Sequence, residues 1–320
     1  MAVLMTIKRH RKPLLFVLGL TLLILIIVLS DIGEVIEALR PLTWVQLALL
    51  VGLQLLTLIL INVQWRAVAW HLKLSLSFRS LLKMNFLGTF FESVTPAVKT
   101  GGEAYKFFYL KQERLSSGDA AALITTQKGI SFMTFLTMAL IALLSSGLTR
   151  LLEASVLTVI AVNAGIILGV FVAFFLVVRR QQSRPADTPG KFAEFFNALA
   201  KLKDHKQRLV VHALLGGIIW ALYALKTMVV LRMVGVELAF TVVAAITYIT
   251  YIVNMLPLSP GGLGTFEGTM TGLLVAFSIA PGVALAVTIT LRVFTFWFML
   301  LLSALYLGID HVIRRQGFII

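Results

Sequence analysis

Charged side chains lie inside the long apolar stretches of this sequence, where they could bind a ligand. The acids there are Glu92, Glu103 and Glu267. The bases there are Lys83, Lys99, Lys106, Lys128, Lys226 and Arg292. A charge at the centre of a membrane costs about 2.5–3.5 kcal/mol on insertion scales, so each of these residues is a functional candidate. Three acids can neutralise three of the six bases, and the remaining positive charge favours an anionic ligand such as a phosphate.

Several of these charges also have a structural interpretation. Lys83 and Lys106 lie near the ends of predicted helices, where a lysine can extend its ammonium group to water. Lys226 could reach the outer membrane surface in the same way. Glu103 and Glu267 each follow a glycine-rich segment, so either carboxylate could instead complement the N-terminus of a new helix.

Arg292 is the base that we expect to lie deepest. It comes eleven residues after Pro281, which begins the last apolar run, and therefore lies about 16 Å along the helix axis. We expect its guanidinium group to pair with Glu267 or Glu103 when no ligand is bound and with an anionic ligand otherwise. Lys128, in an earlier apolar run, would add a second deep cation.

Two segments rich in proline and glycine interrupt the apolar stretches. They are Thr-Pro-Ala-Val-Lys-Thr-Gly-Gly at 95–102 and Leu-Pro-Leu-Ser-Pro-Gly-Gly at 256–262. Proline and glycine at this density end a helix. Unwound backbone at membrane depth is tolerated only where it is buried in protein or lines a polar cavity. The helix that follows each break begins with unpaired amides at the positive end of its dipole, which suits an anion.

Together, the breaks and the deep charges predict one cationic pocket of the size of a headgroup. Its predicted residues are Thr95, Pro96, Lys99, Gly101, Gly102, Glu103, Lys128, Pro260, Gly261, Gly262, Gly264, Glu267 and Arg292.

The composition excludes several classes of protein. Hydrophobic residues make up 59% of the 320 residues and charged residues 13%, whereas a soluble domain has about 25% charged residues. The apolar residues form long runs rather than alternating segments, which indicates helices and not an outer-membrane barrel. The chain has no cysteine, which excludes disulfides and thiolate metal sites. The net charge of +14 has no soluble domain to carry it, so we expect no nucleic acid partner.

Signatures of catalysis are missing from the sequence. The five histidines fall at the ends of apolar runs or in loops, and no His-Glu-x-x-His motif occurs. The aspartates are unpaired, whereas metal or acid–base chemistry normally needs clustered acids or histidines. We therefore expect no enzyme activity, no cofactor and no metal.

The elements that must position these residues are apolar helices. Crossing the hydrocarbon takes about 20 residues. The runs of suitable composition are 14–29, 44–72, 117–147, 152–178, 208–234 and 281–309. The two interrupted stretches, 78–112 and 239–279, do not fit this list, and we predict that both are re-entrant helical hairpins. The second could alternatively be two full spans, which would give eight spans instead of six.

Basic residues determine the predicted orientation. They are concentrated at the N-terminus, after the second run, after 78–112, in the loop 179–208 and in the C-terminal tail. The positive-inside rule therefore predicts a protein of the inner (cytoplasmic) membrane with both termini in the cytoplasm. Within the loop, phenylalanine and leucine recur at helical spacing over 191–203, which indicates either a helix on the anionic membrane surface or an ordinary basic loop.

The predicted elements follow the order span, span, hairpin, span, and this order occurs twice. Because each half has three spans, the second half is inverted, as in many secondary transporters. We therefore predict an all-α, polytopic helical membrane protein with one transmembrane domain, 1–320. It consists of an inverted repeat of 1–148 and 149–320.

Two sequence segments resemble a known family. The first contains Asn-Phe-Leu-Gly at 85–88, Thr-Pro at 95–96 and Gly-Gly-Glu-Ala at 101–104. The second reads Leu-Pro-Leu-Ser-Pro-Gly-Gly-Leu-Gly-Thr-Phe-Glu at 256–267. They resemble the flippase-like family, the transmembrane region of lysylphosphatidylglycerol synthases, which also occurs as stand-alone bacterial and archaeal membrane proteins. The resemblance covers nearly the whole chain. Arg292 fits the arginine of that family's last helix, and Lys128 stands where the family has an arginine.

The resemblance implies translocation of a lipid between leaflets, which in the named synthases is an aminoacylated phosphatidylglycerol. The synthases add a cytoplasmic aminoacyl-transferase domain, which we do not expect here because the chain stops at Ile320. Stand-alone relatives are associated with other lipids, so the predicted partner is a membrane phospholipid or another polar lipid. Enzymes of lipid or envelope synthesis and a second copy of the chain are further candidate partners. The alternatives are a membrane-embedded lipid-modifying enzyme and an accessory subunit of an envelope-lipid pathway.

Overall fold

The fold is seen in a computed structural model that describes residues 32–40, 42–94, 100–147, 206–255 and 260–315. It also describes the single residues Gly165, Gly169, Val172, Leu176 and Phe195. Within these ranges every regular element is a helix and no strand occurs. The prediction of an all-α, polytopic membrane protein is confirmed.

Within the described ranges, four helices are long and apolar enough to cross a membrane. They cover Trp44–His71, Ser117–Ser145, Arg208–Met233 and Pro281–Ile309. The first is α3 (Trp44–His71), the second is α6 (Ser117–Ser145) and the third lies within α9 (Lys206–Met233). Each agrees with a predicted span. The predicted spans 14–29 and 152–178, the surface helix 191–203 and most of the loop 179–208 lie outside the described residues.

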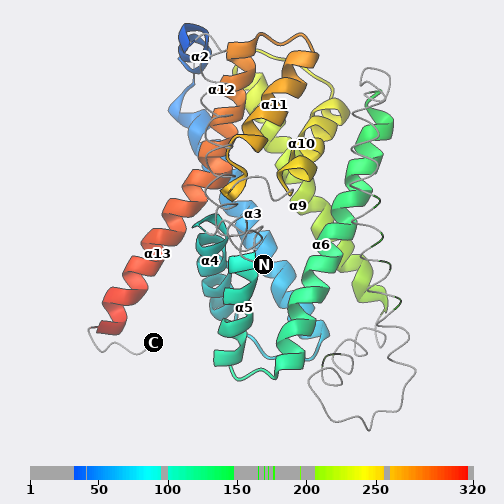
Figure 1. Ribbon diagram of the computed structural model, residues 1–320, viewed down its shortest axis with the longest axis vertical. Helices are drawn as coiled ribbons and strands as arrows, with labels where there is room; N and C mark the ends of the chain where they lie inside the picture. Colours follow the sequence, from blue (N-terminus) through cyan, green and yellow to red (C-terminus); the bar gives the residue numbers. More distant parts are fainter. Residues whose placement is uncertain are drawn as a thin grey trace, which may run out of the picture. The chain divides into compact units, whose positions relative to one another are not determined.

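The last span is not one continuous α-helix. It consists of α12 (Pro281–Arg292), a π-helical turn η4 (Val293–Trp297) and α13 (Phe298–Arg315). In the π-turn the Phe298 amide donates to the Val293 carbonyl, five residues earlier, so this turn holds one residue more than an α-helical turn. The chain bends here, and α13 continues at an angle to α12 (Figure 1).

Both predicted breaks separate two helices. The first lies between α4 (Phe78–Val94) and α5 (Thr100–Gln112). The second lies between α10 (Phe240–Asn254) and α11 (Thr265–Ala276), with the short 3-10 turn η3 (Pro260–Gly262) immediately before α11. The predicted helix–break–helix pattern is therefore confirmed in both stretches. Their re-entrance into the membrane stays a prediction.

The chain divides into two compact units. Unit 1 consists of Met1–Gln54, Phe86–Gly102 and Ala224–Ile320. Unit 2 consists of Leu55–Asn85 and Glu103–Tyr223. The helices α3, α4, α5 and α9 each contribute one end to each unit.

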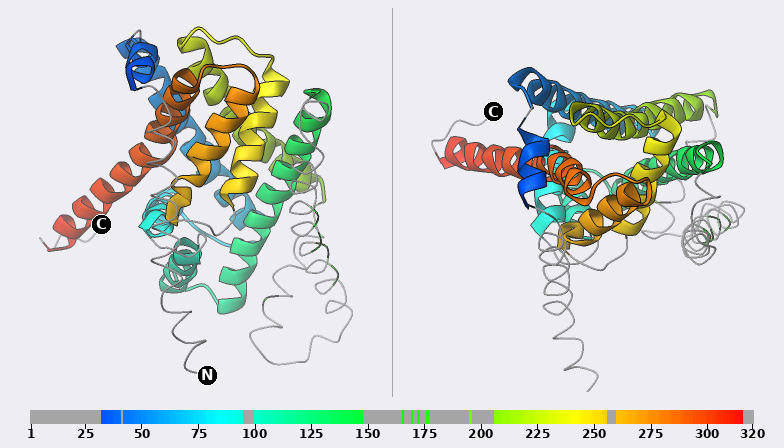
Figure 2. Two further views of the ribbon diagram at one scale, coloured as in Figure 1. Left: turned by 45° about the horizontal axis from the view of Figure 1, so that its top comes forward. Right: turned by 90° about the horizontal axis from the view of Figure 1, so that it is seen from above.

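Unit 1 is built around three consecutive helices. α10 packs against α11, and α11 packs against α12, as two directions of view show (Figures 1 and 2). The short helix α2 (Ile32–Leu39) packs against α12. Small residues of α10 and α12, including Ala244, Ala284 and Ala286, are buried, and small residues allow helices to pack closely. This packing holds the second break beside the deep end of α12.

Unit 2 has a hydrophobic core around Trp65, Leu110 and Leu123, which come from α3, α5 and α6. Buried amides link its helices: Gln127 Nε2 donates to Gln64 Oε1 at 3.2 Å, and Gln64 Nε2 donates to a backbone carbonyl of α9. Because hydrocarbon cannot satisfy an amide, such interhelical bonds fix which helices lie together.

Candidate functional site

The deep charges of unit 1 form an ion pair. Nε of Arg292 lies 2.8 Å from Oε1 of Glu267, and the two side chains are only 6% and 5% exposed. A charge buried to this degree is strongly unfavourable without a partner, and here each charge neutralises the other. Of the two acids predicted as partners of Arg292, Glu267 is the one that pairs with it.

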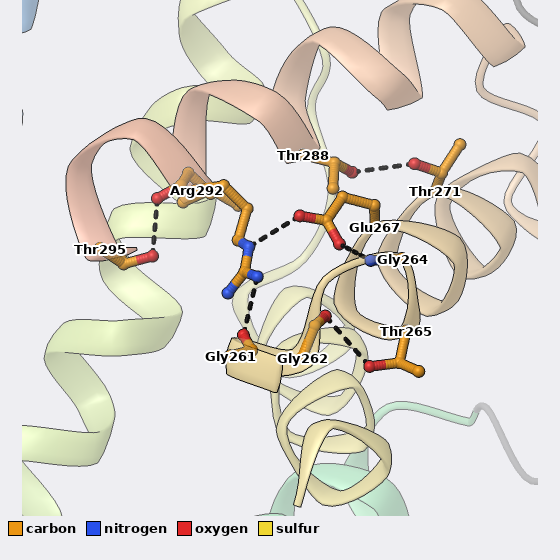
Figure 3. A network of polar contacts seen from close by, with 10 residues as sticks. Gly261, Gly262, Gly264, Thr265, Glu267, Thr271, Thr288, Arg292 and Thr295 are labelled. Carbon is orange, nitrogen blue, oxygen red and sulfur yellow. Dashed lines mark hydrogen bonds and ion pairs between the residues drawn. The ribbon is translucent and has the colours of Figure 1, made fainter. Parts of the chain in front are cut away.

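Both members of the pair also bind the backbone of the second break (Figure 3). The second carboxylate oxygen of Glu267, Oε2, accepts the Gly264 amide at 2.7 Å, which caps the start of α11. Nη2 of Arg292 donates to the Gly261 carbonyl at 2.9 Å. Gly261 and Gly264 have φ angles of 60° and 79°, in the left-handed region that favours glycine. Glu267 therefore has both of the roles considered for it, ion-pair partner and helix cap.

A second polar contact lies one helical turn away from the ion pair. Thr271 Oγ1 and Thr288 Oγ1 lie 3.1 Å apart and join α11 to α12. Thr271 follows Glu267 by four residues and Thr288 precedes Arg292 by four, so the two contacts are successive on the same pair of helices (Figure 3). α11 and α12 are thus held together by polar contacts at two levels.

Two aromatic rings contact the guanidinium group of Arg292. Its Cζ lies 4.9 Å from the centroid of the Phe266 ring and 4.4 Å from that of the Phe296 ring. Cation–π contacts of this length are attractive, and more so when they are removed from water. The remaining terminal nitrogen, Nη1, makes no hydrogen bond to the described part of the chain.

The end of α4 lies beside this site within unit 1. If Gly261 carried a Cβ atom, that atom would lie 3.7 Å from the Ser93 carbonyl oxygen. Ser93 comes just before the first break, so the entry to the first break lies next to the second break. Gly102, just after the first break, packs tightly on α4: a Cβ there would lie 2.6 Å from the Gly88 carbonyl oxygen and 2.9 Å from Glu92 Cβ.

A second charged cluster lies in unit 2, where α5 and α6 are side by side (Figure 1). Oε1 of Glu103 lies 2.8 Å from the ammonium group of Lys128 and 3.1 Å from that of Lys106. Among the described residues, one carboxylate thus faces two cations. The side chain of Lys128 is 42% exposed, and the other carboxylate oxygen of Glu103 is buried and accepts no hydrogen bond from the described residues.

Two lysines do not behave as the sequence suggested. Lys106 was expected to extend to water, but it is buried, because it pairs with Glu103 one turn earlier and lies 5.3 Å from the Trp65 ring. For Lys226 one interpretation was that it reaches the outer surface, but it is 1% exposed and donates to Gln54 Oε1 at 2.6 Å. In both cases a polar partner on the same or another helix turns the flexible stem inward.

The predicted site residues have different places in the structure. Gly261, Gly264, Glu267 and Arg292 come together in unit 1, where Gly262 also accepts a hydrogen bond from Thr265 Oγ1 at 3.0 Å. Pro260 begins η3, and Gly101 lies in the first turn of α5 beside Gly102. Glu103 and Lys128 pair in unit 2. Thr95, Pro96 and Lys99 lie outside the described residues. The prediction that all of them line one pocket stays a prediction.

Some polar contacts were missed at the sequence level. Phe266 and Phe296 contact Arg292, and the only available signal was that Phe296 follows it by four residues. His71 and His212 form a buried contact, with Nδ1 of the first 3.1 Å from Nε2 of the second. Each was placed correctly at the end of a span, but its partner could not be read from spacing. Among the described residues no three His, Asp or Glu side chains cluster to hold a metal.

Comparison with known proteins identifies the family. The model of the lysylphosphatidylglycerol synthase transmembrane region matches residues 16–303. The chain belongs to this family. It is also 24% identical over 315 residues to a UPF0104 membrane protein of Methanothermobacter thermautotrophicus, covering 90% of this chain and 92% of that one. A UPF0104 membrane protein of Pyrococcus horikoshii is 23% identical over 324 residues, covering 92% and 96%.

The family match includes every predicted site residue of both clusters. A UPF0104 membrane protein of Methanocaldococcus jannaschii shows the same extent of similarity, 22% identity over 311 residues, with 91% of this chain and 93% of the relative covered. The chain thus corresponds to nearly the full length of these relatives. Membership of this family indicates a role related to membrane lipids.

Proposed function

We propose that this membrane protein moves a polar lipid with an anionic phosphate in its headgroup from one leaflet to the other. The headgroup would contact the buried charges while the acyl tails stay in the bilayer. The family points to membrane lipids. The polar contacts described above supply the chemistry that a phosphate requires.

The observation that carries this proposal is the burial of Arg292 and the set of hydrogen bonds that its guanidinium group makes. An arginine deep in an apolar helix is costly and is retained chiefly where it functions. Here Nε and Nη2 donate to Glu267 and Gly261, and Nη1 donates to no residue in the described ranges. A planar guanidinium group with spare donors matches the geometry of a phosphate.

The ion pair can open without isolating either charge. If a phosphate replaces Glu267 at Arg292, the carboxylate keeps its hydrogen bond to the Gly264 amide at the positive end of α11. Arg292 keeps the Gly261 carbonyl. Exchange of one anion for another at the guanidinium group is therefore less costly than breaking a buried pair outright.

The cluster in unit 2 supports the same function. The partly exposed ammonium group of Lys128 suits an anionic headgroup that approaches from water. The oxygen of Glu103 that lacks a partner in the described residues could accept a hydroxyl or ammonium proton of the same headgroup.

The membrane arrangement belongs to the same proposal. The protein resides in the inner membrane with both termini in the cytoplasm, and its two broken stretches are re-entrant hairpins of an inverted repeat. The proposed transport forms and breaks no covalent bond, so the protein is not an enzyme in this account. Its partner is a phospholipid or another polar lipid.

A proteoliposome assay tests this function. The full chain is reconstituted with trace fluorescent phosphatidylglycerol, and dithionite bleaches the probe in the outer leaflet. We expect the protein to make the inner-leaflet probe accessible, whereas a fluorescent ceramide, which lacks a phosphate, should show no protein-dependent gain. Bleaching confined to the outer leaflet with both probes would contradict the proposal. A covalently altered probe would instead support the lipid-modifying enzyme.

A further inference from the structure

The π-turn after Arg292 brings one aromatic ring into the site. Of its five residues, Val293 and Trp297 are exposed at 43% and 45%, whereas Phe296 is half-buried. π-helical turns are rare in proteins and occur frequently at functional sites. We therefore ask which side chain this π-helical turn brings into the site.

Phe296 contacts both the charge and the backbone that holds it. Its ring centroid lies 4.4 Å from Cζ of Arg292. The same ring packs on Gly261: a Cβ at that position would lie 2.8 Å from Cζ and 2.9 Å from Cε2 of Phe296. Gly261 in turn accepts Nη2 of Arg292. Arg292, Gly261 and Phe296 thus form a closed set of three mutual contacts.

We propose that Phe296 is a positioning residue, which holds the guanidinium group of Arg292 in place while its anionic partner changes. This inference rests on the proposed function, since it assumes that a lipid phosphate replaces Glu267. The Gly261 carbonyl fixes one terminal nitrogen and the phenyl ring restricts the guanidinium group, so Nη1 stays directed to the ligand. An arginine held only by Glu267 would lose its orientation at the moment of exchange.

Gly261 contributes to the same positioning of Arg292. Its φ angle of 60° and the closeness of the ring both exclude a larger side chain. The glycine therefore allows the last span to press its ring against the break. This contact links the conformation of the second break to the orientation of the arginine.

Two variants distinguish the effect of the aromatic ring of Phe296 from the effect of its apolar volume. Phe296→Leu keeps an apolar side chain and loses the π-system, whereas Phe296→Tyr keeps the ring. The first readout needs no lipid: it is the Nε–H signal of Arg292 in a 15N-arginine NMR spectrum of the detergent-solubilised full chain, assigned by its loss in Arg292→Lys. We expect this signal to stay sharp in Phe296→Tyr and to broaden in Phe296→Leu, with both variants folded.

The second readout is binding of dioctanoyl phosphatidic acid. It is measured as the rise of the thermal unfolding temperature with the concentration of this lipid. We expect Phe296→Leu to weaken binding about tenfold and Phe296→Tyr less than about twofold, in keeping with the strength of a desolvated cation–π contact. In Arg292→Lys, the further change Phe296→Leu should have less than half this effect.

The outcomes distinguish the positioning role of Phe296 from the proposed binding of a lipid phosphate. An unchanged Nε–H signal in Phe296→Leu overturns the positioning role, whatever the lipid does. A broadened signal together with no phosphatidic acid binding by the unmodified chain supports the positioning role and contradicts the proposed phosphate ligand. Equal weakening of binding by Leu and Tyr shows that only packing matters, and this also overturns the inference.

Discussion

At the scale of single residues, the two charged clusters differ in how far each charge is buried. Glu267 and Arg292 are almost fully covered and satisfy one another. In the other cluster, Lys106 is buried but Lys128 is 42% exposed. Removing one member of a buried ion pair leaves the other charge without a partner and destabilises the fold, whereas a partly exposed ion pair contributes little to folding.

Arg292→Met tests the buried pair. The variant leaves the Glu267 carboxylate without its cation, so we expect the free energy of unfolding to fall by about 3–5 kcal/mol. Arg292→Lys keeps the charge and should lose much less. The measurement is thermal and denaturant unfolding in detergent, with Arg232→Met, at an exposed arginine, as the control. Equal stability of the Arg292→Met and Arg232→Met variants would show that Glu267 does not depend on Arg292.

The lysines of the second cluster should separate stability from function. Lys106→Met removes a buried cation from Glu103 and from the Trp65 ring, and we expect clear destabilisation. Lys128→Met removes a half-exposed partner and should cost no more than about 1 kcal/mol. Phospholipid translocation should fall in Lys128→Met despite its stability. A fully active Lys128→Met protein would restrict the ligand site to unit 1.

At the scale of elements, the glycines at the breaks act by permitting close approach. Gly102 lies where any Cβ would press on the Gly88 carbonyl and Glu92 of α4. Gly272, in contrast, lies within α11 with no neighbour within 4 Å of a Cβ. The same substitution should therefore have opposite effects at these two helical glycines.

Gly102→Ala should destabilise the protein by about 1–3 kcal/mol, because α4 and the start of α5 must move apart. Gly272→Ala should be neutral or stabilising by up to about 1 kcal/mol, because alanine favours a helix interior. Unfolding in detergent measures both. A stabilised Gly102→Ala protein would show that the first hairpin is open at this point.

The sequence predicted these elements well where its signal was local. Proline and glycine placed both breaks, and the depth of Arg292 indicated that it pairs with an acid, either Glu267 or Glu103. The π-turn was missed because one additional residue in a helical turn leaves no mark on composition or hydrophobic pattern. The interpretation of Lys106 and Lys226 as lysines that extend to water is wrong, because their ammonium groups contact Glu103 and Gln54, and only the folded chain brings Gln54 close to Lys226.

At the scale of the whole molecule, the claim that can be tested is re-entrance. The chain has no natural cysteine, so single cysteines report accessibility without background. Gly261 is a poor site for a label, because its φ angle and the Phe296 ring exclude a side chain. Leu263, two residues later, and Gly101 are the better positions.

Leu263→Cys and Gly101→Cys should react slowly with membrane-impermeant maleimides from either side of the membrane. Glu113→Cys and Glu237→Cys, both at exposed positions between helices, are the controls and should react quickly from the cytoplasm and from outside respectively. Rapid labelling of Leu263→Cys from the cytoplasm would mean that the second broken stretch spans the membrane fully, giving eight spans.

The most direct test of the account is phospholipid translocation by Arg292 variants reconstituted at equal density. The unmodified chain and the control Arg232→Lys should expose inner-leaflet fluorescent phosphatidylglycerol to dithionite at the same rate. Arg292→Lys stays folded but loses the planar donor fork, so its rate should fall at least about tenfold. A folded Arg292→Lys or Arg292→Met protein that transports the probe at the full rate would contradict the central claim that Arg292 receives the phosphate of the lipid.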